Sequence, residues 1–335
     1  MPVSKSDDLL ALPLAARAGT PRVSVIIPAY NVAPYIAASL ASVLAQTYRK
    51  FEVIVINDGS ADALATALAP YRGQIHYIEQ ANLGAGPARN AGILQARGEL
   101  VAFLDGDDLW RPDFLASQVA FLDAHNYDLV YADAGIFGES ALAGRTYMQD
   151  APSTGEANFA SLLGQRCNVI TSGTVARRQA LLEAGLFEWE NVRGQDFNLW
   201  LRLAHQGVRF GYQKKVLLDY RVRLDSHSGN SVQRLERSIN ALQRTTYKMQ
   251  LNETEQQIMQ NQMAWLKNLL VVEKGKALLL QGDFTAARTA FEQANEYRKS
   301  VRLQAIIWLL RWSPRFLLKI YKSQRAADIP FVPQS

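Results

Sequence analysis

Three carboxylates lie within the four residues Asp105, Gly106, Asp107 and Asp108. They follow the apolar residues 100–104, which predict a buried strand ending at this turn. Like charges this close repel one another, and a bound cation can neutralise them. Oxygen ligands in this number favour Mn²⁺ or Mg²⁺ over Zn²⁺, and such an ion at a strand end can hold a diphosphate. The alternative is a solvated acidic loop ahead of the next helix.

Short apolar runs alternate with helical segments through the first part of the chain. Strands are expected at residues 23–27 (stopped by Pro28), 51–56, 75–78, 100–104 and 128–131, and helices at residues 33–46, 61–71, 84–96 and 112–124. This alternation predicts right-handed βαβ units and a largely parallel sheet in an α/β fold.

Polar turns follow three of these strands, at residues 28–31, 57–60 and 105–108. Parallel sheets bind ligands outside the carboxyl ends of their strands, so we expect the three turns to share one edge. The chain has no Gly-x-Gly-x-x-Gly after the first strand and no Gly-Lys-Ser or Gly-Lys-Thr. The pattern therefore indicates a nucleotide crevice that is neither a dinucleotide fold nor a P-loop.

Seven short motifs occur in a fixed order along the chain. They lie at residues 25–31, 42–47, 55–60, 82–84, 88–92, 103–108 and 196–203. In order and spacing they resemble family 2 of the GT-A glycosyltransferases, over about residues 22–231. The resemblance implies a Rossmann-like GT-A domain that transfers a hexose from a nucleoside-diphosphate sugar, a UDP-sugar first of all, with inversion. The Gln-x-x-Arg-Trp motif and membrane spans of the processive relatives are missing from the sequence, so addition of a single sugar is expected.

The resemblance also assigns residues to the donor. It implies a nucleotide-sugar site of Pro28, Tyr30, Asp58, Arg89, Asp105 and Gly106, and a metal site of Asp105, Asp107 and Asp108. Asp58 would contact the nucleobase, Tyr30 would stack on it, and Arg89 would pair with base or phosphate oxygens. From the residues alone, Asp58 is equally a turn residue, Tyr30 a half-buried aromatic and Arg89 a surface ion-pair partner.

Inverting transfer needs a base that takes the proton of the attacking hydroxyl. The family supplies an aspartate from a Glu-Asp pair, and this chain has Gln195 and Asp196 there. The resemblance thus implies Asp196 as the base, with Glu188 and Glu190 as further candidates. The neutral Gln195 puts in doubt any role of the glutamate in acceptor binding. The structural alternative for Asp196 is a cap on the helix that follows.

Arg223 and His227 belong to a Gly- and Ser-containing segment that resembles the family's closing segment near the diphosphate. The resemblance implies a lid that meets the phosphates. Taken alone, His227 is a solvated loop histidine.

Composition and charge set the outer bounds. The 335 residues are 48% hydrophobic and include one cysteine, Cys167, which favours a globular protein of a reducing compartment. Residues 1–21 predict a polar leader without the order of a signal peptide, and no apolar run nears the ~20 residues of a membrane span. We therefore expect a cytoplasmic protein. Residues 298–325 hold eight basic residues and no acidic one. The charge of this segment alone exceeds the formal net charge of +5, so the basic balance of the chain comes from its C-terminal part. It therefore does not imply that the protein binds nucleic acid.

The remaining chain predicts a helical extension at residues 232–326 and a loose tail at 327–335. Basic residues lie at 302–322 among Trp and Tyr, and they recur every three or four positions from Arg311 to Lys322. This pattern predicts either contact with an anionic membrane surface, at the inner face, or a helix packed on the catalytic domain. The sequence leaves both open.

Two other functions share parts of this pattern. A sugar-phosphate nucleotidyltransferase would use a similar sheet and metal, but residues 28–34 lack its Gly-rich basic loop. A catalytically silent nucleotide-binding scaffold is favoured by Gln195 and disfavoured by the retained aspartates. The transferase is the leading hypothesis, with a glycan or lipid-linked acceptor in cell-surface polysaccharide synthesis.

Overall fold

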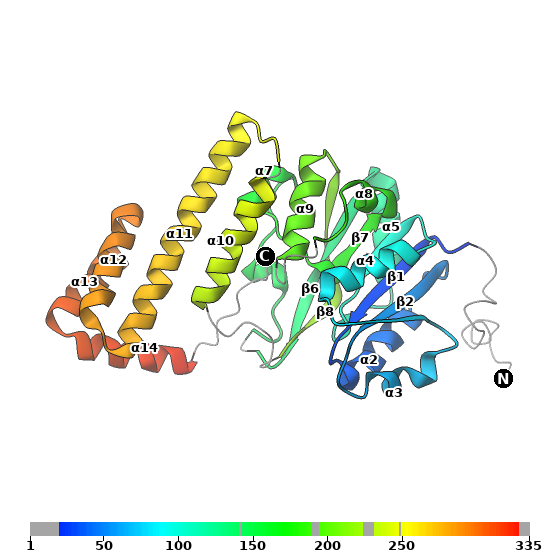
Figure 1. The fold of residues 1–335 in the computed structure, drawn as a ribbon, viewed down its shortest axis with the longest axis horizontal. Coiled ribbons are helices and arrows are strands. Elements are labelled where there is room, and N and C mark those ends of the chain that lie inside the picture. The colour runs from blue at the N-terminus through cyan, green and yellow to red at the C-terminus, as the bar shows by residue number, and fades with distance from the viewer. Residues whose placement is uncertain (1–19, 141, 189–193, 224–230, 248, 328–335) are drawn as a thin grey trace. The chain divides into compact units, whose positions relative to one another are not determined.

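The computed structural model describes residues 20–140, 142–188, 194–223, 231–247 and 249–327. The expected leader up to residue 19, the tail beyond residue 327, Glu190 and His227 lie outside these residues. Packing divides the chain after Val222 into two compact units, and each is described by itself (Figure 1).

The first unit is built on one eight-stranded sheet. Its strands are β1 (Val23–Ala29), β2 (Phe51–Asp58), β3 (His76–Gln80), β4 (Leu100–Phe103), β5 (Leu109–Trp110), β6 (Leu129–Gly138), β7 (Thr174–Arg177) and β8 (Phe210–Val222), in the order β3-β2-β1-β4-β7-β6-β8-β5. Strands β1 to β4 pair in parallel, as do β6 and β8. The predicted α/β fold with a largely parallel sheet is confirmed.

Two strands run against the others, which the sequence did not indicate. Strand β7 pairs antiparallel with both β4 and β6, and β5 pairs antiparallel with β8. Because β7 enters the sheet from the carboxyl edge of β4, the 3-10 turn before it, Thr171–Gly173, lies beside the end of β4. The side chains of this turn contact both Asp105 and Asp196.

Helices flank the sheet. They are α2 (Ala33–Leu44), α3 (Leu64–Leu68), α4 (Ala85–Gln95), α5 (Phe114–His125), α6 (Tyr147–Asp150), α7 (Phe159–Leu163), α8 (Arg178–Glu183) and α9 (Gln195–His205), with a 3-10 turn at Ala69–Tyr71. Helix α4 packs closely on the sheet at Gly92, where a Cβ would lie 2.6 Å from Ile26 Cγ2 and 2.9 Å from Ile56 Cδ1. The close approach fixes the helix that carries Arg89.

Pro28 does not end the first strand, contrary to the expectation. Strand β1 continues to Ala29, and Pro28 pairs in register with Ile56. The carbonyls of Arg22 and Ile26 accept hydrogen bonds from the β4 side, and pairing with β4 stops at Ile26. Pro28 is the next residue of β1 that faces β4. Because the hydrogen bonds between these two strands have already ended, the proline needs no N–H there.

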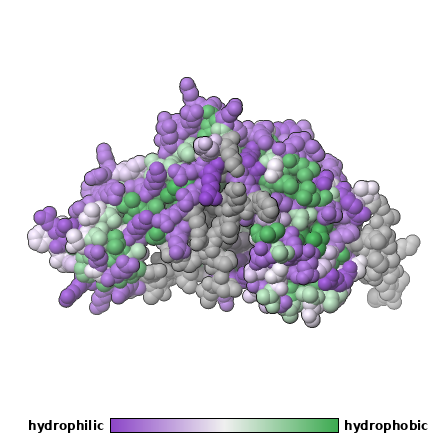
Figure 2. Space-filling view, viewed as in Figure 1, coloured by the Kyte–Doolittle hydropathy of each residue, from purple (hydrophilic) through white to green (hydrophobic). Residues whose placement is uncertain are grey.

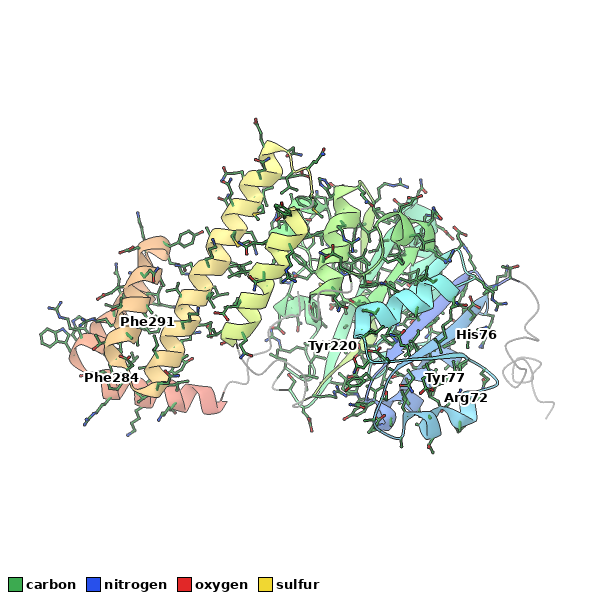
Figure 3. All side chains as sticks on the ribbon, viewed as in Figure 1. Arg72, His76, Tyr77, Tyr220, Phe284 and Phe291 are labelled. Carbon is green, nitrogen blue, oxygen red and sulfur yellow. The ribbon has the colours of Figure 1, made fainter. Side chains whose placement is uncertain are left out.

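The second unit is helical. It consists of α10 (Ser231–Tyr247), α11 (Glu253–Gln281), α12 (Phe284–Arg298), α13 (Val301–Trp312) and α14 (Pro314–Ala327). Its core joins α11 to α14 through buried residues that include Leu279, Phe291, Leu303 and Leu317. A Cβ at Gly275 would lie 3.1 Å from the ring of Phe291, so α11 and α12 pack closely there (Figure 3). None of the described helices has the length and apolar content needed to cross a bilayer.

Candidate active site

The acidic turn follows β4 at the carboxyl edge of the sheet. Asp108 is buried, and its Oδ1 accepts a hydrogen bond from the Arg221 amide at 2.8 Å. Its Oδ2 has no hydrogen-bond partner of good geometry. Burial raises the pKa of Asp108 well above its usual value, and the charges of Asp107 and Asp105 raise it further, while Ser172 and the Arg221 amide lower it less. The three carboxylates therefore lie close enough to disfavour one another's charge.

Two side chains fix the shape of this turn. The Ser39 hydroxyl donates to the carbonyls of Gly106, at 3.0 Å, and Asp108, at 2.7 Å. Arg221 Nε donates to the Asp107 carbonyl at 2.8 Å. The Arg221 guanidinium also lies over the rings of Tyr35 and Phe137, 4.7 and 4.3 Å from their centroids. Arg221 therefore clamps the turn from β8, with the guanidinium held between aromatic rings.

Glycine is required at position 106. A Cβ there would lie 2.9 Å from Val32 Cγ2 and 3.4 Å from the Pro28 carbonyl oxygen. The turn consequently packs directly against the end of β1. Pro28 and Tyr30 thus come from the chain next to the acidic turn, and Tyr30 is 45% exposed.

Arg89 contacts the acidic turn directly. Its Nη2 lies 2.5 Å from Asp105 Oδ1, and the arginine side chain is 8% exposed. The next residue, Asn90, donates to the Phe187 carbonyl at 2.8 Å and accepts from its amide at 2.9 Å. Helix α4 therefore holds both Asp105 and the segment that leads toward α9. The structure gives Arg89 a carboxylate partner within the protein, in addition to the ligand contact that the resemblance implies.

Asp58 is buried at the end of β2. It accepts hydrogen bonds from Gln80 Nε2 at 2.8 Å, the Leu83 amide at 3.0 Å and the Gly84 amide at 2.8 Å. These bonds hold the loop ahead of α4. The turn after β2 is closed instead by Asn57, whose Oδ1 accepts from the Ser60 amide at 2.9 Å. The structural alternative for Asp58 as a turn residue is therefore replaced by a role in holding a neighbouring loop.

Asp196 lies in the first turn of α9, half-buried. Its Oδ2 accepts from the Thr171 hydroxyl at 3.0 Å, and its Oδ1 from the Phe197 amide at 2.9 Å. Gly194, with a φ of 73°, is the residue that caps the helix, so Asp196 is not the cap. The positive end of the helix dipole favours a negative charge at this position.

The 3-10 turn joins Asp196 to the acidic turn. Thr171 bonds Asp196, and the hydroxyl of the adjacent Ser172 accepts from the Asp105 amide at 3.1 Å. Both residues of this turn are buried, with exposed fractions of 6% and 1%. Two adjacent side chains thus fix the predicted base beside the predicted metal ligands.

Two tyrosines complete the link. The rings of Tyr147 and Tyr220 meet edge to face with centroids 6.0 Å apart. Burial raises the pKa of both hydroxyls; Asp196 raises that of Tyr147 further, and Asp108 that of Tyr220. Each phenol therefore stays neutral beside a carboxylate at ordinary pH.

Not every predicted residue joins this arrangement. Glu188 accepts a hydrogen bond from Asn198 Nδ2 at 3.3 Å, which places it in the packing of α9. Arg223 belongs to the second unit. The sequence analysis missed the roles of Ser39, Tyr147, Thr171, Ser172 and Arg221. Only Arg221 had a signal, because it adjoins the segment that resembles a lid; the others are isolated residues without a pattern.

The acidic turn does not form a complete metal cage by itself. Within the described residues, no three carboxylate, imidazole or thiolate side chains gather closely enough to hold an ion alone. Mg²⁺ is usually bound through one or two carboxylates together with substrate phosphates. The unpartnered Oδ2 of Asp108 and the neighbouring Asp105 and Asp107 fit such a shared site.

Comparison with known proteins identifies sequence relatives of this chain. The sequence profile of "Glycosyl transferase family 2" matches residues 24–184. The chain is 33%, 33% and 34% identical to three Rickettsia glycosyltransferases, of which its match spans only about a third (32%, 32% and 28%). The UDP-Glc:alpha-D-GlcNAc-diphosphoundecaprenol beta-1,3-glucosyltransferase WfaP of Escherichia coli is 28% identical over 66% of this chain and 85% of that protein.

The fold is shared with solved structures as well. The mannosyltransferase PcManGT of Pyrobaculum calidifontis, in complex with GDP-Man and Mn²⁺, superimposes with a TM-score of 0.60 at 20% identity, over 96% of this chain and 91% of that one.

The uncharacterised glycosyltransferase RT0329 of Rickettsia typhi is 32% identical over 65% of this chain and 69% of its own length. The chain belongs to glycosyl transferase family 2.

Proposed function

We propose that this chain transfers one hexose, with inversion, from a nucleoside-diphosphate sugar to a hydroxyl of a glycan or lipid-linked acceptor in cell-surface polysaccharide synthesis. The observation that carries the proposal is the pair Thr171 and Ser172, which ties Asp196 to the acidic turn through hydrogen bonds of 3.0 and 3.1 Å. A proton acceptor then lies beside the group that holds the leaving diphosphate. WfaP, whose name gives UDP-Glc and a diphosphoundecaprenol-linked acceptor, supports a UDP-sugar and a lipid-linked acceptor.

The donor end rests on the acidic turn and its neighbours. Asp107, with Asp105 and Asp108, would hold Mn²⁺ or Mg²⁺, which when bound stabilises the negative charge of the departing nucleoside diphosphate. Arg89 orients the Asp105 carboxylate through their ion pair. The structure of PcManGT is a complex with GDP-Man and Mn²⁺. This complex supports a metal-bound donor in a protein of the same fold.

The nucleobase would lie at the carboxyl ends of β1 and β2. The exposed ring of Tyr30 can stack on it, with Pro28 as part of the frame. Asp58 accepts three hydrogen bonds, one from Gln80 and two from amides of the loop ahead of α4. An ionised carboxylate has about four acceptor positions, so one remains for a base N–H.

The acceptor end rests on Asp196. The acceptor oxygen attacks the anomeric carbon, the bond from that carbon to the diphosphate oxygen breaks, and Asp196 takes the hydroxyl proton. Thr171 fixes one carboxylate oxygen, which leaves the half-buried group oriented for this transfer. We further propose that the chain works in the cytoplasm at the inner face of a membrane.

Calorimetric titration of UDP, GDP and dTDP, with and without Mn²⁺, tests the donor site. We expect one nucleotide to bind only with Mn²⁺, and this binding to be lost in Asp107→Asn. Asp113→Asn removes an exposed carboxylate just after the turn and should bind as the wild type does. Failure of all three nucleotides to bind, or equal binding by Asp107→Asn, would refute the proposed site.

A further inference from the structure

Helix α13 presents an apolar face that the protein does not bury. Trp308 is 61% exposed, Trp312 65% and Val301 79%. They are spaced seven and four residues apart, about two turns and one turn of helix, so they share one face. Leu303 and Leu310, on the opposite side, are buried in the core of the second unit. One face of the helix is therefore packed within the second unit, and the other faces solvent.

Exposed basic side chains lie on the same helix and on the helix that follows it. Arg302 and Arg311 are exposed on α13, and Arg315 and Lys319 on α14, which also exposes Phe316 by 57%. The sequence from residue 298 to residue 325 contains no acidic residue. Figure 2 shows hydrophobic and hydrophilic residues interspersed over the helices of this unit. We call Val301, Trp308, Trp312, Phe316 and the four basic residues the aromatic-basic face.

We propose that the aromatic-basic face binds the surface of an anionic membrane. Tryptophan and phenylalanine insert at the boundary between headgroups and acyl chains, where an indole N–H can still reach water. Arginine and lysine beside them pair with acidic headgroups. Charge complementarity favours this surface, because the segment is basic throughout and has no acidic residue that anionic headgroups would repel.

The two kinds of contact act together. A shallow apolar insertion alone binds weakly, and basic residues alone bind in a strongly salt-dependent way. The face supplies both from a packed helix, so no segment has to fold on binding. The inference does not require the proposed transfer reaction, although a lipid-linked acceptor would be presented at such a surface.

Sedimentation with vesicles tests the proposal on the full-length chain. We expect binding to vesicles of phosphatidylcholine mixed with phosphatidylglycerol, and at least tenfold weaker binding to phosphatidylcholine alone. Trp308→Ser/Trp312→Ser and Arg311→Glu/Arg315→Glu should each weaken binding to the mixed vesicles by about tenfold or more. Because all four side chains are exposed, these variants are expected to fold.

Two matched variants serve as controls. Lys214→Glu/Lys215→Glu makes the same charge change at exposed residues of the first unit, and Trp265→Ser removes a partly exposed tryptophan of α11. Both should bind as the wild type does. Equal loss in the controls, no binding to mixed vesicles, or binding to single-stranded DNA that competes with the vesicles would overturn the proposal. Nucleotide binding measured on the same variants separates this result from the fate of the donor site.

Discussion

At the scale of single residues, the site depends on side chains that shape the acidic turn without being its ligands. Arg221 is the main one, because its amide binds Asp108 and its Nε binds the Asp107 carbonyl, both at 2.8 Å. The backbone amide would survive a substitution, whereas the Nε contact and the stacking on Tyr35 and Phe137 would not. Arg221 is thus a positioning residue for the predicted metal ligands.

We expect Arg221→Gln to weaken metal-dependent nucleotide binding by about tenfold, equivalent to ~1.4 kcal/mol. The reason is that the turn would lose one charged hydrogen bond and its aromatic clamp. Calorimetry with Mn²⁺ measures the change, and the circular dichroism spectrum should be unaltered. Arg209→Gln is a matched control, because Arg209 pairs with Asp128 just before the start of the same strand. Unchanged binding in Arg221→Gln would show that the turn keeps its shape without the clamp.

Residue roles were only partly predictable from the sequence. The acidic turn and Asp196 carry their chemistry in the residue type and its position after a strand or before a helix. Thr171, Ser172 and Tyr147 do not, because they reach the site through the antiparallel entry of β7 and through loops with no periodic pattern. Arg89 was found, but its ion pair with Asp105 depends on a contact between α4 and the turn after β4 that no local pattern encodes.

At the scale of elements, strands with continuous apolar runs were predictable and their directions were not. Strands β1, β2 and β4 are buried on both faces, so Val, Ile, Leu and Phe dominate their sequences. Strand β7 has only four residues and follows a loop, so nothing local marks it as antiparallel. Pro28 was misjudged because tolerance for proline depends on whether a neighbouring strand needs its N–H, which is a property of the sheet.

A buried carboxylate secures the other end of the sheet, away from the site. Glu52 is 1% exposed and accepts hydrogen bonds from Ser24 Oγ at 2.7 Å and from the Arg97 amide and Nε at 2.8 Å. Burial by itself would raise the pKa of Glu52, but these hydrogen bonds and the Arg97 charge outweigh it and lower the pKa below 4.5. The ionised form of Glu52 therefore stabilises the pairing of β1 with β2.

Glu52→Gln should lower stability at neutral pH by about 2 kcal/mol, or Tm by about 5 °C. Because folding lowers the pKa, the stabilisation is present above about pH 4.5 and disappears as the pH falls through the lowered pKa. The wild type and the variant should therefore converge in acid. Thermal melts from neutral pH down to pH 3 measure this, and a constant difference across the range would show that the charge is not responsible.

At the scale of the whole molecule, the chain combines a family 2 catalytic unit with a helical unit that carries the aromatic-basic face. The first could be predicted because its motifs are many and ordered. The exposed face of α13 could not, since the same sequence pattern suits a packed helix and a membrane helix. Only the structure shows that Leu303 and Leu310 are covered while Trp308 and Trp312 are not.

The central claim is that Asp196 is the base and the acidic turn holds the donor, so the two functions should separate. The most direct measurement compares wild type and Asp196→Asn for nucleotide binding by calorimetry and for release of nucleoside diphosphate from the matching sugar conjugate with an undecaprenyl-diphosphate-linked acceptor. The account predicts unchanged donor affinity and a loss in kcat of about a hundredfold or more. The asparagine keeps an oxygen for the Phe197 amide, so the helix start should persist. Loss of binding together with turnover, or no loss of either, would contradict the account.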